Sequence, residues 1–342
     1  MEEINSLSFI ELEKVVKNLS ENSFRAKQLF NWFHEKLVYD YDKMTNLSLS
    51  LRNKLKEKYP LYELYIVQKL VSNIDGTKKY LFKLQDGNII ESVLMKYKHG
   101  ASVCISTQVG CRMGCKFCAS TIDGLVRNLT PAEMLGQVYS IINDTNEKVS
   151  NIVMMGTGEP LENYENMLKF LELINNEQGQ NIGIRHITIS TCGIAPKILE
   201  LADLNFGLTL AISLHATTND KRCKIMPITN KYSLEDILDA VKIYITKTNR
   251  RVTFEYGLIL GKNDSQEDAK ELVTLLKGLN CHVNLIPINT IDEKDYKASS
   301  TKNIAEFAKI LNAQNIQTTI RRKLGEDIDA ACGQLRRRFV NL

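Results

Sequence analysis

Apolar, β-rich runs alternate with amphipathic helical patterns along most of this chain, beginning near residue 103. Buried strands that alternate with helices predict a parallel sheet with helices packed against it. About six strand–helix units are present, too few to close an eight-stranded barrel, so the pattern predicts an α/β fold with a partial (β/α)6 parallel barrel. The strands are expected at residues 103–108, 151–155, 186–190, 208–214, 251–260, 282–288 and 318–322, and the first two helices at 131–146 and 163–175.

The N-terminal part of the chain has a different organisation. Apolar residues recur at helical spacing there, as at Leu12, Val16 and Leu19. The pairs Asp75-Gly76 and Asp86-Gly87 are strong hairpin turn signals, and they separate short strands expected at residues 63–71, 78–84 and 88–95. We therefore expect an N-terminal helical domain and a small antiparallel β section within residues 1–98, followed by the β/α core in residues 99–342.

The composition is that of a globular protein. Hydrophobic residues make up 44% of the 342 residues and charged residues 25%, and no apolar run approaches the length of a membrane span. The first residues lack a signal-peptide pattern, and eight cysteines fit a reducing compartment, where thiols serve metals or catalysis. We expect a cytoplasmic, monomeric protein without membrane contact. The net charge of +4 permits nucleic-acid binding without requiring it.

Three cysteines are closely spaced in the run Gly110-Cys111-Arg112-Met113-Gly114-Cys115-Lys116-Phe117-Cys118. Four-iron clusters usually take four thiolates, so a C-x3-C-x2-C loop leaves one iron free to bind a small molecule. The spacing differs from the paired C-x2-C of structural zinc sites. Three unrelated thiols, or zinc with a distant fourth ligand, are the alternatives. The two glycines favour a loop that folds tightly, because their backbone is unhindered.

Polar groups follow the expected strands at the end where parallel barrels form their sites. Each group has an ordinary structural interpretation when taken alone. Together they predict a single rim that carries hydroxyl, carboxylate, imidazole and amide groups beside the cysteine loop. The segments are Gly156-Thr157-Gly158-Glu159-Pro160 after the second strand, Ser190-Thr191 after the third, Ser213-Leu214-His215 after the fourth, and Asn289 after the sixth.

Basic residues cluster near the C-terminus, in Arg321-Arg322-Lys323 and Arg336-Arg337-Arg338. Charge runs of this kind are usually solvated surface. Their position on both sides of Cys332 favours a role in RNA binding instead.

These features together resemble the radical SAM enzymes, which use S-adenosylmethionine (SAM) and an iron–sulfur cluster. The cysteine spacing is typical of that superfamily, and the loop with Gly158-Glu159 resembles the one that holds the SAM amino group. Further strings resemble the RlmN and Cfr family of RNA methyltransferases, from about residue 25 to residue 335. They are Met154-Met155-Gly156-Thr157-Gly158-Glu159-Pro160-Leu161, Ile189-Ser190-Thr191, Ile212-Ser213-Leu214-His215, Met226-Pro227-Ile228, Val283-Asn284-Leu285-Ile286-Pro287 and, most specific, Asp327-Ile328-Asp329-Ala330-Ala331-Cys332-Gly333-Gln334-Leu335.

The resemblance implies the cofactors and their ligands. Cys111, Cys115 and Cys118 would hold a [4Fe-4S] cluster whose open iron binds SAM, and an electron from the cluster would cleave SAM to a 5′-deoxyadenosyl radical. The implied SAM-binding residues are Gly158, Glu159, Ser190, Ser213, Leu214, His215 and Asn289.

Three further catalytic residues are implied by the same resemblance. Adenine C2 is electron-poor and cannot attack a methyl group, whereas a thiolate is a strong nucleophile. Cys332 would therefore take a methyl group from one SAM, and a radical made from a second SAM would activate it. Glu91 would remove the C2 proton, and Cys104 would release the product by forming a disulfide with Cys332. Without the resemblance, Cys104 and Glu91 have ordinary structural interpretations.

The implied substrates are an adenine of 23S rRNA in the peptidyl-transferase region and the adenosine 3′ to a tRNA anticodon. An electron donor such as flavodoxin or ferredoxin would supply electrons. Glu159-Pro160 and the basic ending resemble the C2-specific RlmN members, and a Cfr-like C8 methyltransferase is the alternative. A non-catalytic iron–sulfur RNA-binding protein would need neither Glu159 nor Cys332. Cys192, Cys223 and Cys281 match no role and are interpreted as structural.

Overall fold

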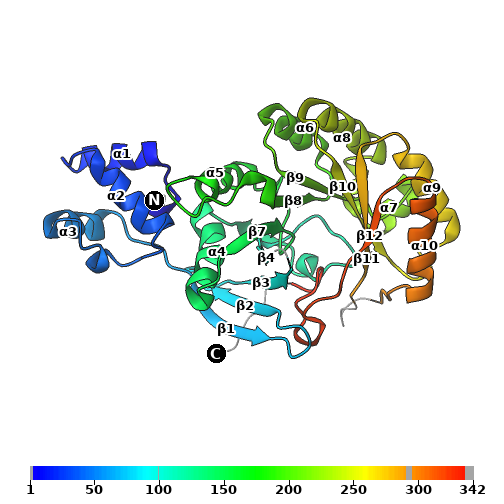
Figure 1. The fold of residues 1–342 in the computed structure, drawn as a ribbon, viewed down its shortest axis with the longest axis horizontal. Helices are drawn as coiled ribbons and strands as arrows, with labels where there is room; N and C mark the ends of the chain where they lie inside the picture. Colours follow the sequence, from blue (N-terminus) through cyan, green and yellow to red (C-terminus); the bar gives the residue numbers. More distant parts are fainter. Residues whose placement is uncertain (1–2, 99, 290–294, 336–342) are drawn as a thin grey trace.

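The fold is centred on one curved, ten-stranded sheet in the order β1-β2-β3-β4-β7-β8-β9-β10-β11-β12 (Figure 1). The computed structural model describes residues 3–98, 100–289 and 295–335. Every neighbouring pair from β4 onward is parallel, which confirms the predicted partial (β/α)6 barrel. The parallel strands are β4 (Gly100–Cys104), β7 (Val149–Met154), β8 (Ile187–Thr191), β9 (Thr209–Ser213), β10 (Val252–Leu258), β11 (Cys281–Pro287) and β12 (Thr318–Ile320).

Helices connect the parallel strands and lie on the outside of the curved sheet (Figure 1). Their starts carry local signals: Thr130 and Glu133 form a capping box at α4, and Ser233 and Asp236 form one at α8. α4 ends at Asn146 in the left-handed conformation that favours helix termination. The helices are α4 (Pro131–Thr145), α5 (Tyr164–Asn175), α6 (Ala195–Leu204), α7 (Asn219–Ile225), α8 (Leu234–Thr248), α9 (Gln266–Leu276) and α10 (Thr301–Ala313).

The N-terminal helices form a lobe beside the barrel and share its main hydrophobic core (Figure 1). A buried contact links the lobe to α4, because His34 Nδ1 lies 3.1 Å from the hydroxyl of Tyr139. The Ser6 hydroxyl accepts a hydrogen bond from Ala132 N at the start of α4. These contacts fix the lobe against the barrel. Its helices are α1 (Phe9–Asn18), α2 (Phe24–His34) and α3 (Leu49–Lys58).

The predicted antiparallel section is present and extends the same sheet. It consists of β1 (Tyr65–Val71), β2 (Lys78–Lys83) and β3 (Ile89–Tyr97), and β3 pairs antiparallel with β4. Gly76 and Gly87 have φ of 73° and 82°, which is what the predicted turns require. The boundary expected at residue 98 falls between two paired strands, β3 and β4. The division into residues 1–98 and 99–342 stays a prediction.

The strand predicted at residues 103–108 is wrong in its extent. β4 ends at Cys104, and Gln108 begins a separate two-stranded sheet of β5 (Gln108–Gly110) and β6 (Leu125–Asn128). Between them, Ile105 N donates to Val153 O and Thr107 N donates to Thr157 O. The apolar run is continuous across this change of partner, so the sequence pattern does not reveal it.

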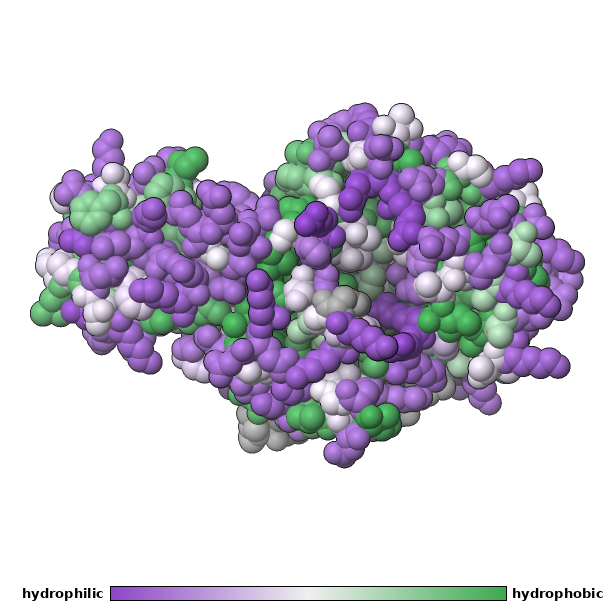
Figure 2. Space-filling model, viewed as in Figure 1, coloured by the Kyte–Doolittle hydropathy of each residue, from purple (hydrophilic) through white to green (hydrophobic). Residues whose placement is uncertain are grey.

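The face in Figure 2 is hydrophilic over most of both lobes, and the larger lobe is hollowed near its centre. Within the described residues, none of the helices combines the length and the apolar character needed to cross a membrane.

Candidate active site

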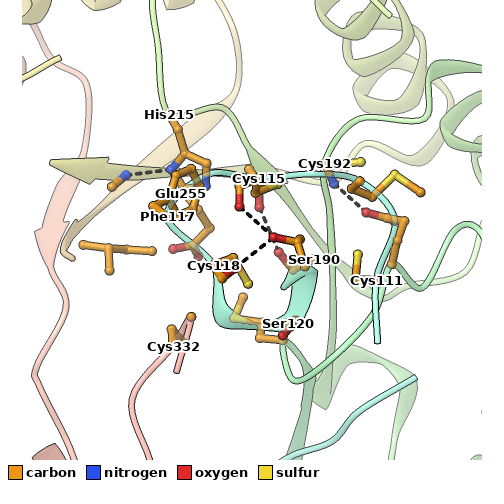
Figure 3. Close-up of a pocket in the computed structure, with 18 of the residues that line it drawn as sticks. Cys111, Cys115, Phe117, Cys118, Ser120, Ser190, Cys192, His215, Glu255 and Cys332 are labelled. Carbon is orange, nitrogen blue, oxygen red and sulfur yellow. Dashed lines mark hydrogen bonds between the residues drawn. The ribbon is translucent and has the colours of Figure 1, made fainter. Parts of the chain in front are cut away.

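A cavity that is partly open to solvent lies at the C-terminal ends of the parallel strands. Barrels of this type form their sites at this edge of the sheet. Figure 3 shows its residues arranged around the space between the cysteine loop and the C-terminal segment. Most of the predicted site residues line it: Cys111, Cys115, Cys118, Gly158, Glu159, Ser190, Ser213, His215, Asn289 and Cys332. Leu214 does not line it, because its side chain lies in the main core.

The cysteine loop is a tight fold that starts at a glycine. Gly110 has φ of 75°, and a Cβ atom there would lie 1.9 Å from the carbonyl oxygen of Gly124. That oxygen accepts a hydrogen bond from Cys111 N at 3.0 Å. Further along, the hydroxyl of Thr121 donates to the carbonyl oxygens of Cys115 and Cys118, at 3.0 Å each. These bonds place all three thiols beside the cavity.

Replacing Gly110 by alanine is expected to lower the iron content of the purified protein several-fold. The added Cβ collides with backbone rather than with a movable side chain, and a positive φ disfavours alanine. Iron and sulfide analysis of anaerobically reconstituted protein measures the effect. Gly124→Ala is the matched control, because Gly124 also has a positive φ but a Cβ there meets nothing within 4 Å. Equal iron contents in the two variants would contradict the expectation.

The loop fits an iron–sulfur cluster better than a single metal ion. Among the described residues, no group of three His, Cys, Asp or Glu side chains is arranged to hold one ion, as a zinc site requires. A four-iron cluster instead binds each thiolate through a different iron. Burial raises the pKa of Cys111, and it raises the pKa of Cys115 to about 12. Deprotonation of these thiols therefore depends on a bound metal.

Glu159 is a buried carboxylate held by backbone groups. Its two oxygens accept hydrogen bonds from Leu161 N at 3.0 Å and from Cys192 N at 2.7 Å. Burial raises its pKa, so an adjacent cation would favour the ionised form. Gly158, with φ of 111°, packs so closely on Gln108 that a Cβ would lie 2.7 Å from that residue's backbone nitrogen. The loop therefore presents a fixed carboxylate suited to an ammonium group.

His215 presents a neutral imidazole to the same cavity. Its Nδ1 accepts a hydrogen bond from Gly257 N at 2.7 Å, and burial lowers its pKa to about 3. Nδ1 is therefore unprotonated near neutral pH, and Nε2 carries the proton and can donate it to a ligand. The ring packs edge-on against Phe117, with 4.8 Å between the centroids.

The side-chain oxygen of Asn289, Oδ1, is a buried hydrogen-bond acceptor. Its Nδ2 donates to the carbonyl oxygen of Cys332 at 3.1 Å. Its Oδ1 makes no hydrogen bond within the part of the chain that the structure describes. An unpaired buried acceptor in a ligand cavity is a site for a hydroxyl or amine donor, such as those of SAM.

Cys332 lies where two cavities meet. It lines the large cavity together with the cysteine loop, and it lines a second cavity together with Cys104. Figure 3 shows it approaching the loop from a separate stretch of chain. Two bonds anchor this stretch to the loop: Ala119 N donates to Gly333 O at 2.8 Å, and the Ser120 hydroxyl donates to Leu335 O at 2.7 Å. The structure thus brings Cys332 within reach of both cavities.

Cys104 is buried at the end of β4. Burial raises its pKa to about 12, and a negative charge on Cys332 would add to the rise, whereas Arg321 opposes it. Cys104 pairs with Val93 across β3 and β4. Its thiol is thus held protonated until the surroundings change.

Glu91 does not line either cavity. It is fully buried on β3, and its carboxylate lies 3.0 Å from Lys79 Nζ. Lys79 also donates to the carbonyl oxygen of Asp329, in the segment that carries Cys332. Glu91 is two residues from Val93, so both lie on the face that carries Cys104. Glu91 therefore lies on the same face of the sheet as Cys104, beneath the C-terminal segment.

Two charged residues that line the large cavity were not predicted as members of the site. Arg321 lines both cavities, and its guanidinium lies 3.9 Å from the buried carboxylate of Glu255, which lines the large cavity. Burial raises the pKa of Glu255. A charged residue inside the apolar run at 251–260 was the available sequence signal for Glu255. Arg321 was predicted only as part of a basic cluster.

The three cysteines without a predicted role differ in their position relative to the cavities. Cys192 lines the large cavity, and its backbone holds Glu159, so it contributes to the site beyond the structural role expected of it. Cys223 and Cys281 line none of the described cavities. Arg336, Arg337 and Arg338 lie outside the described residues.

The comparisons with known proteins agree with this geometry. The family model of the radical SAM superfamily matches residues 105–276, and that of the ribosomal RNA large subunit methyltransferase N-terminal domain matches residues 3–60. A radical SAM methyltransferase from Sphaerobacter thermophilus has a solved structure with a TM-score of 0.94 and 43% identity, covering 98% of this chain and 99% of that one.

Curated relatives are similar over nearly the whole chain. A probable dual-specificity RNA methyltransferase RlmN from Clostridium novyi (strain NT) is 55% identical over 340 residues, which is 99% of each chain. Its counterpart from Clostridium tetani (strain Massachusetts / E88) is 57% identical over 334 residues, covering 98% of this chain and 95% of the relative.

The barrel and its cysteine-lined cavity define a radical SAM enzyme. At more than half identity over almost its full length, the chain belongs to the RlmN family of dual-specificity RNA methyltransferases. Membership implies SAM and an iron–sulfur cluster as cofactors, and the thiols, Glu159 and the free acceptor of Asn289 fit both. RNA is the implied substrate.

Proposed function

We propose that this enzyme methylates C2 of one adenine in the peptidyl-transferase region of 23S rRNA, and C2 of the adenosine 3′ to the anticodon in tRNA. The observation that carries the proposal is the position of Cys332 between two cavities. One cavity carries the thiols for a [4Fe-4S] cluster and the SAM-binding groups, and the other carries Cys104. A methyl carrier needs access to both, because it must be loaded and activated on one side and released on the other.

The cofactors supply the methyl group and the hydrogen-atom abstraction, with two SAM molecules per turnover. Cys332 accepts the methyl group through its sulfur, since a thiolate displaces readily at a sulfonium methyl. After loss of one hydrogen atom, the methylene carbon on Cys332 adds to C2 and joins protein to RNA. The adduct carries one unpaired electron, which must pass to a one-electron acceptor as the C2 proton leaves, and the oxidised iron–sulfur cluster would provide that acceptor. C2 is electron-poor, and this is why a carbon radical is needed there.

The chain's own residues then complete the reaction. Glu91 removes the C2 proton, and its carboxylate lies 3.0 Å from Lys79 Nζ. Cys104 attacks the sulfur of Cys332, releases methylated RNA and forms a Cys104–Cys332 disulfide. Both thiols line the second cavity, which supports this pairing. An external donor such as flavodoxin or ferredoxin returns the disulfide to two thiols.

The proposed SAM-binding residues offer both hydrogen-bond donors and acceptors. Glu159 accepts a hydrogen bond from the ammonium group of SAM. Nε2 of His215 donates a hydrogen bond, and Oδ1 of Asn289 accepts one. Ser190 and Ser213 have hydroxyls 3.5 Å apart on neighbouring strands, and they offer a donor and an acceptor to one ligand group. Gly158 allows close backbone approach, and Leu214 contributes through its backbone position rather than its side chain.

RNA reaches the site as an unstacked base, because the carrier lies inside a cavity. The N-terminal region of residues 1–98 and the exposed Arg322 and Lys323, which line the second cavity, would bind phosphates. We propose that the enzyme acts as a cytoplasmic monomer without membrane contact.

The deciding experiment is methylation in vitro of 23S rRNA and tRNA fragments with isotopically labelled SAM. Nuclease digestion and mass spectrometry against synthetic 2-methyladenosine and 8-methyladenosine locate the new carbon. We expect 2-methyladenosine in both RNAs. Exclusive 8-methyladenosine would establish the Cfr-like alternative instead, and the absence of any methyladenosine with active, reduced enzyme would refute the proposal.

A further inference from the structure

Arg222 is a fully buried arginine one layer behind the cluster cavity. It lies on α7, has 0% exposure and does not line the cavity. Its guanidinium donates to the carbonyl oxygens of Cys192 at 2.6 Å, Leu214 at 3.0 Å and Ser213 at 3.0 Å, and to the hydroxyl of Thr229 at 3.0 Å. These contacts join the ends of β8 and β9 to α7. The guanidinium is therefore held rigidly.

All four of these acceptors are neutral. In the described part of the chain, Arg222 forms no ion pair with a carboxylate, although a buried charge normally has a counter-charge. Burial lowers the pKa of Arg222, and the Cys192 and Cys115 thiolates oppose this change. A guanidinium remains charged in proteins nonetheless.

Arg222 is close enough to the cysteine loop for its charge to interact with the thiol of Cys115. The same α7 segment contacts that loop directly, because Lys116 N donates to Ile225 O at 2.8 Å. Arg222 also lowers the pKa of Cys115, although burial is the larger influence and raises it. Three thiolates outweigh the positive charge of an oxidised four-iron core, so the ligated cluster is anionic, and reduction adds a further negative charge.

We propose that Arg222 is a positioning residue that compensates the charge of the cluster and makes the cluster easier to reduce. The buried guanidinium has no carboxylate partner among the described residues, and an anionic cluster held by the neighbouring loop would offset its burial cost. The proposal rests on the family's cluster and not on the RNA carbon that is methylated. It assigns to this chain a residue that sets how readily the first electron enters.

The test compares Arg222→Lys with Arg222→Met in anaerobically reconstituted protein without SAM or RNA. Lysine and methionine have similar lengths and both lack the guanidinium fork, so the difference between the variants isolates the charge. Cluster reduction is followed by electron paramagnetic resonance at poised potentials. Lys221→Met is the control for the loss of a positive charge from α7 in general. Lys221 is next to Arg222 in the sequence, but its ammonium group pairs with Asp268 and Glu271 on α9.

We expect Arg222→Met to shift the ratio of reduced to oxidised cluster at a fixed potential by about tenfold or more toward oxidised, which is about 59 mV for a one-electron couple. Arg222→Lys and Lys221→Met should stay close to the wild-type ratio. A second measurement uses the proteins without cluster. Without the cluster, the buried lysine of Arg222→Lys has no anionic cluster as a counter-charge. The free energy of unfolding of Arg222→Met, measured in urea, should therefore be at least as high as that of Arg222→Lys.

Three results would overturn the proposal. One is an equal reduction ratio in Arg222→Met and Arg222→Lys. Another is a cluster-free Arg222→Met that is less stable than Arg222→Lys, or fails to fold where Arg222→Lys folds. The third is the failure of both variants to bind a cluster. If Arg222→Met folds but binds no cluster while Arg222→Lys binds it, the requirement for charge is supported. If neither variant binds a cluster, the hydrogen-bonding fork is what matters, and the proposal fails.

Discussion

Cys118→Ala is expected to remove RNA methylation completely and to leave the protein almost without iron. In the proposed cluster each thiolate of the loop would bind a separate iron, so the loss of one would leave two ligands for a cluster that already has an open position. Cys118 lines the large cavity, and its carbonyl oxygen is held by Thr121, so the backbone of the loop should stay in place. Iron and sulfide analysis and the labelled-SAM assay measure the two effects.

Cys223→Ala is the matched control for this substitution. Cys223 is half-buried, lines none of the described cavities and has its sulfur 3.1 Å from Oδ1 of Asn230. The control should hold about four irons per chain and keep its methylation activity. Retention of iron by Cys118→Ala, or bound zinc in the wild-type protein, would be incompatible with the assigned cluster.

Much of the barrel could be predicted from the sequence because parallel strands are buried on both faces. Their apolar runs therefore mark the strands directly, and the observed β7 to β12 lie within a few residues of the predicted positions. The rim could be predicted for a related reason. In such barrels the carboxyl ends of the strands meet at one edge, so Ser190, Ser213 and Asn289 had to come together once the strands were placed.

The parts that escaped prediction depend on contacts between distant segments. The end of β4 at Cys104 follows from bonds to the β7 region, which the local sequence does not encode. The pairing of Lys79 with Glu91, and the placement of both under the C-terminal segment, depends on the register of β2 against β3. The complete burial of Arg222 depends on its contacts with the ends of β8 and β9, which the local sequence does not encode.

The position of Glu91 has a consequence for the reaction cycle. Its carboxylate is fully buried beneath the segment that includes Asp329 and Cys332. A base that removes a proton from RNA must come within hydrogen-bonding distance of it. For Glu91 to act as the proposed base, the segment would have to shift when RNA binds, and the Lys79–Asp329 bond is one contact that such a shift would break.

Cys104→Ala is expected to give a protein that is covalently attached to RNA and does not turn over. Loading, activation and addition to C2 all need Cys332, whereas release needs a second thiol. Without Cys104 the reaction should stop at the joined protein–RNA species. The substitution removes one buried sulfur and should cost only about 1 kcal/mol of stability, so the protein should remain folded. A gel run before and after nuclease treatment detects the attached RNA.

Two comparisons make this result specific to Cys104. Cys281→Ala removes another partly buried cysteine that lines none of the described cavities, and it should give RNA-free protein with normal turnover. The double variant Cys104→Ala, Cys332→Ala should also be RNA-free, because no methyl carrier remains to form the bond. If Cys104→Ala is itself RNA-free and active, then Cys104 is only a packing residue of β4. Release would then need another thiol, and Cys192, which lines the large cavity, would be the first to test.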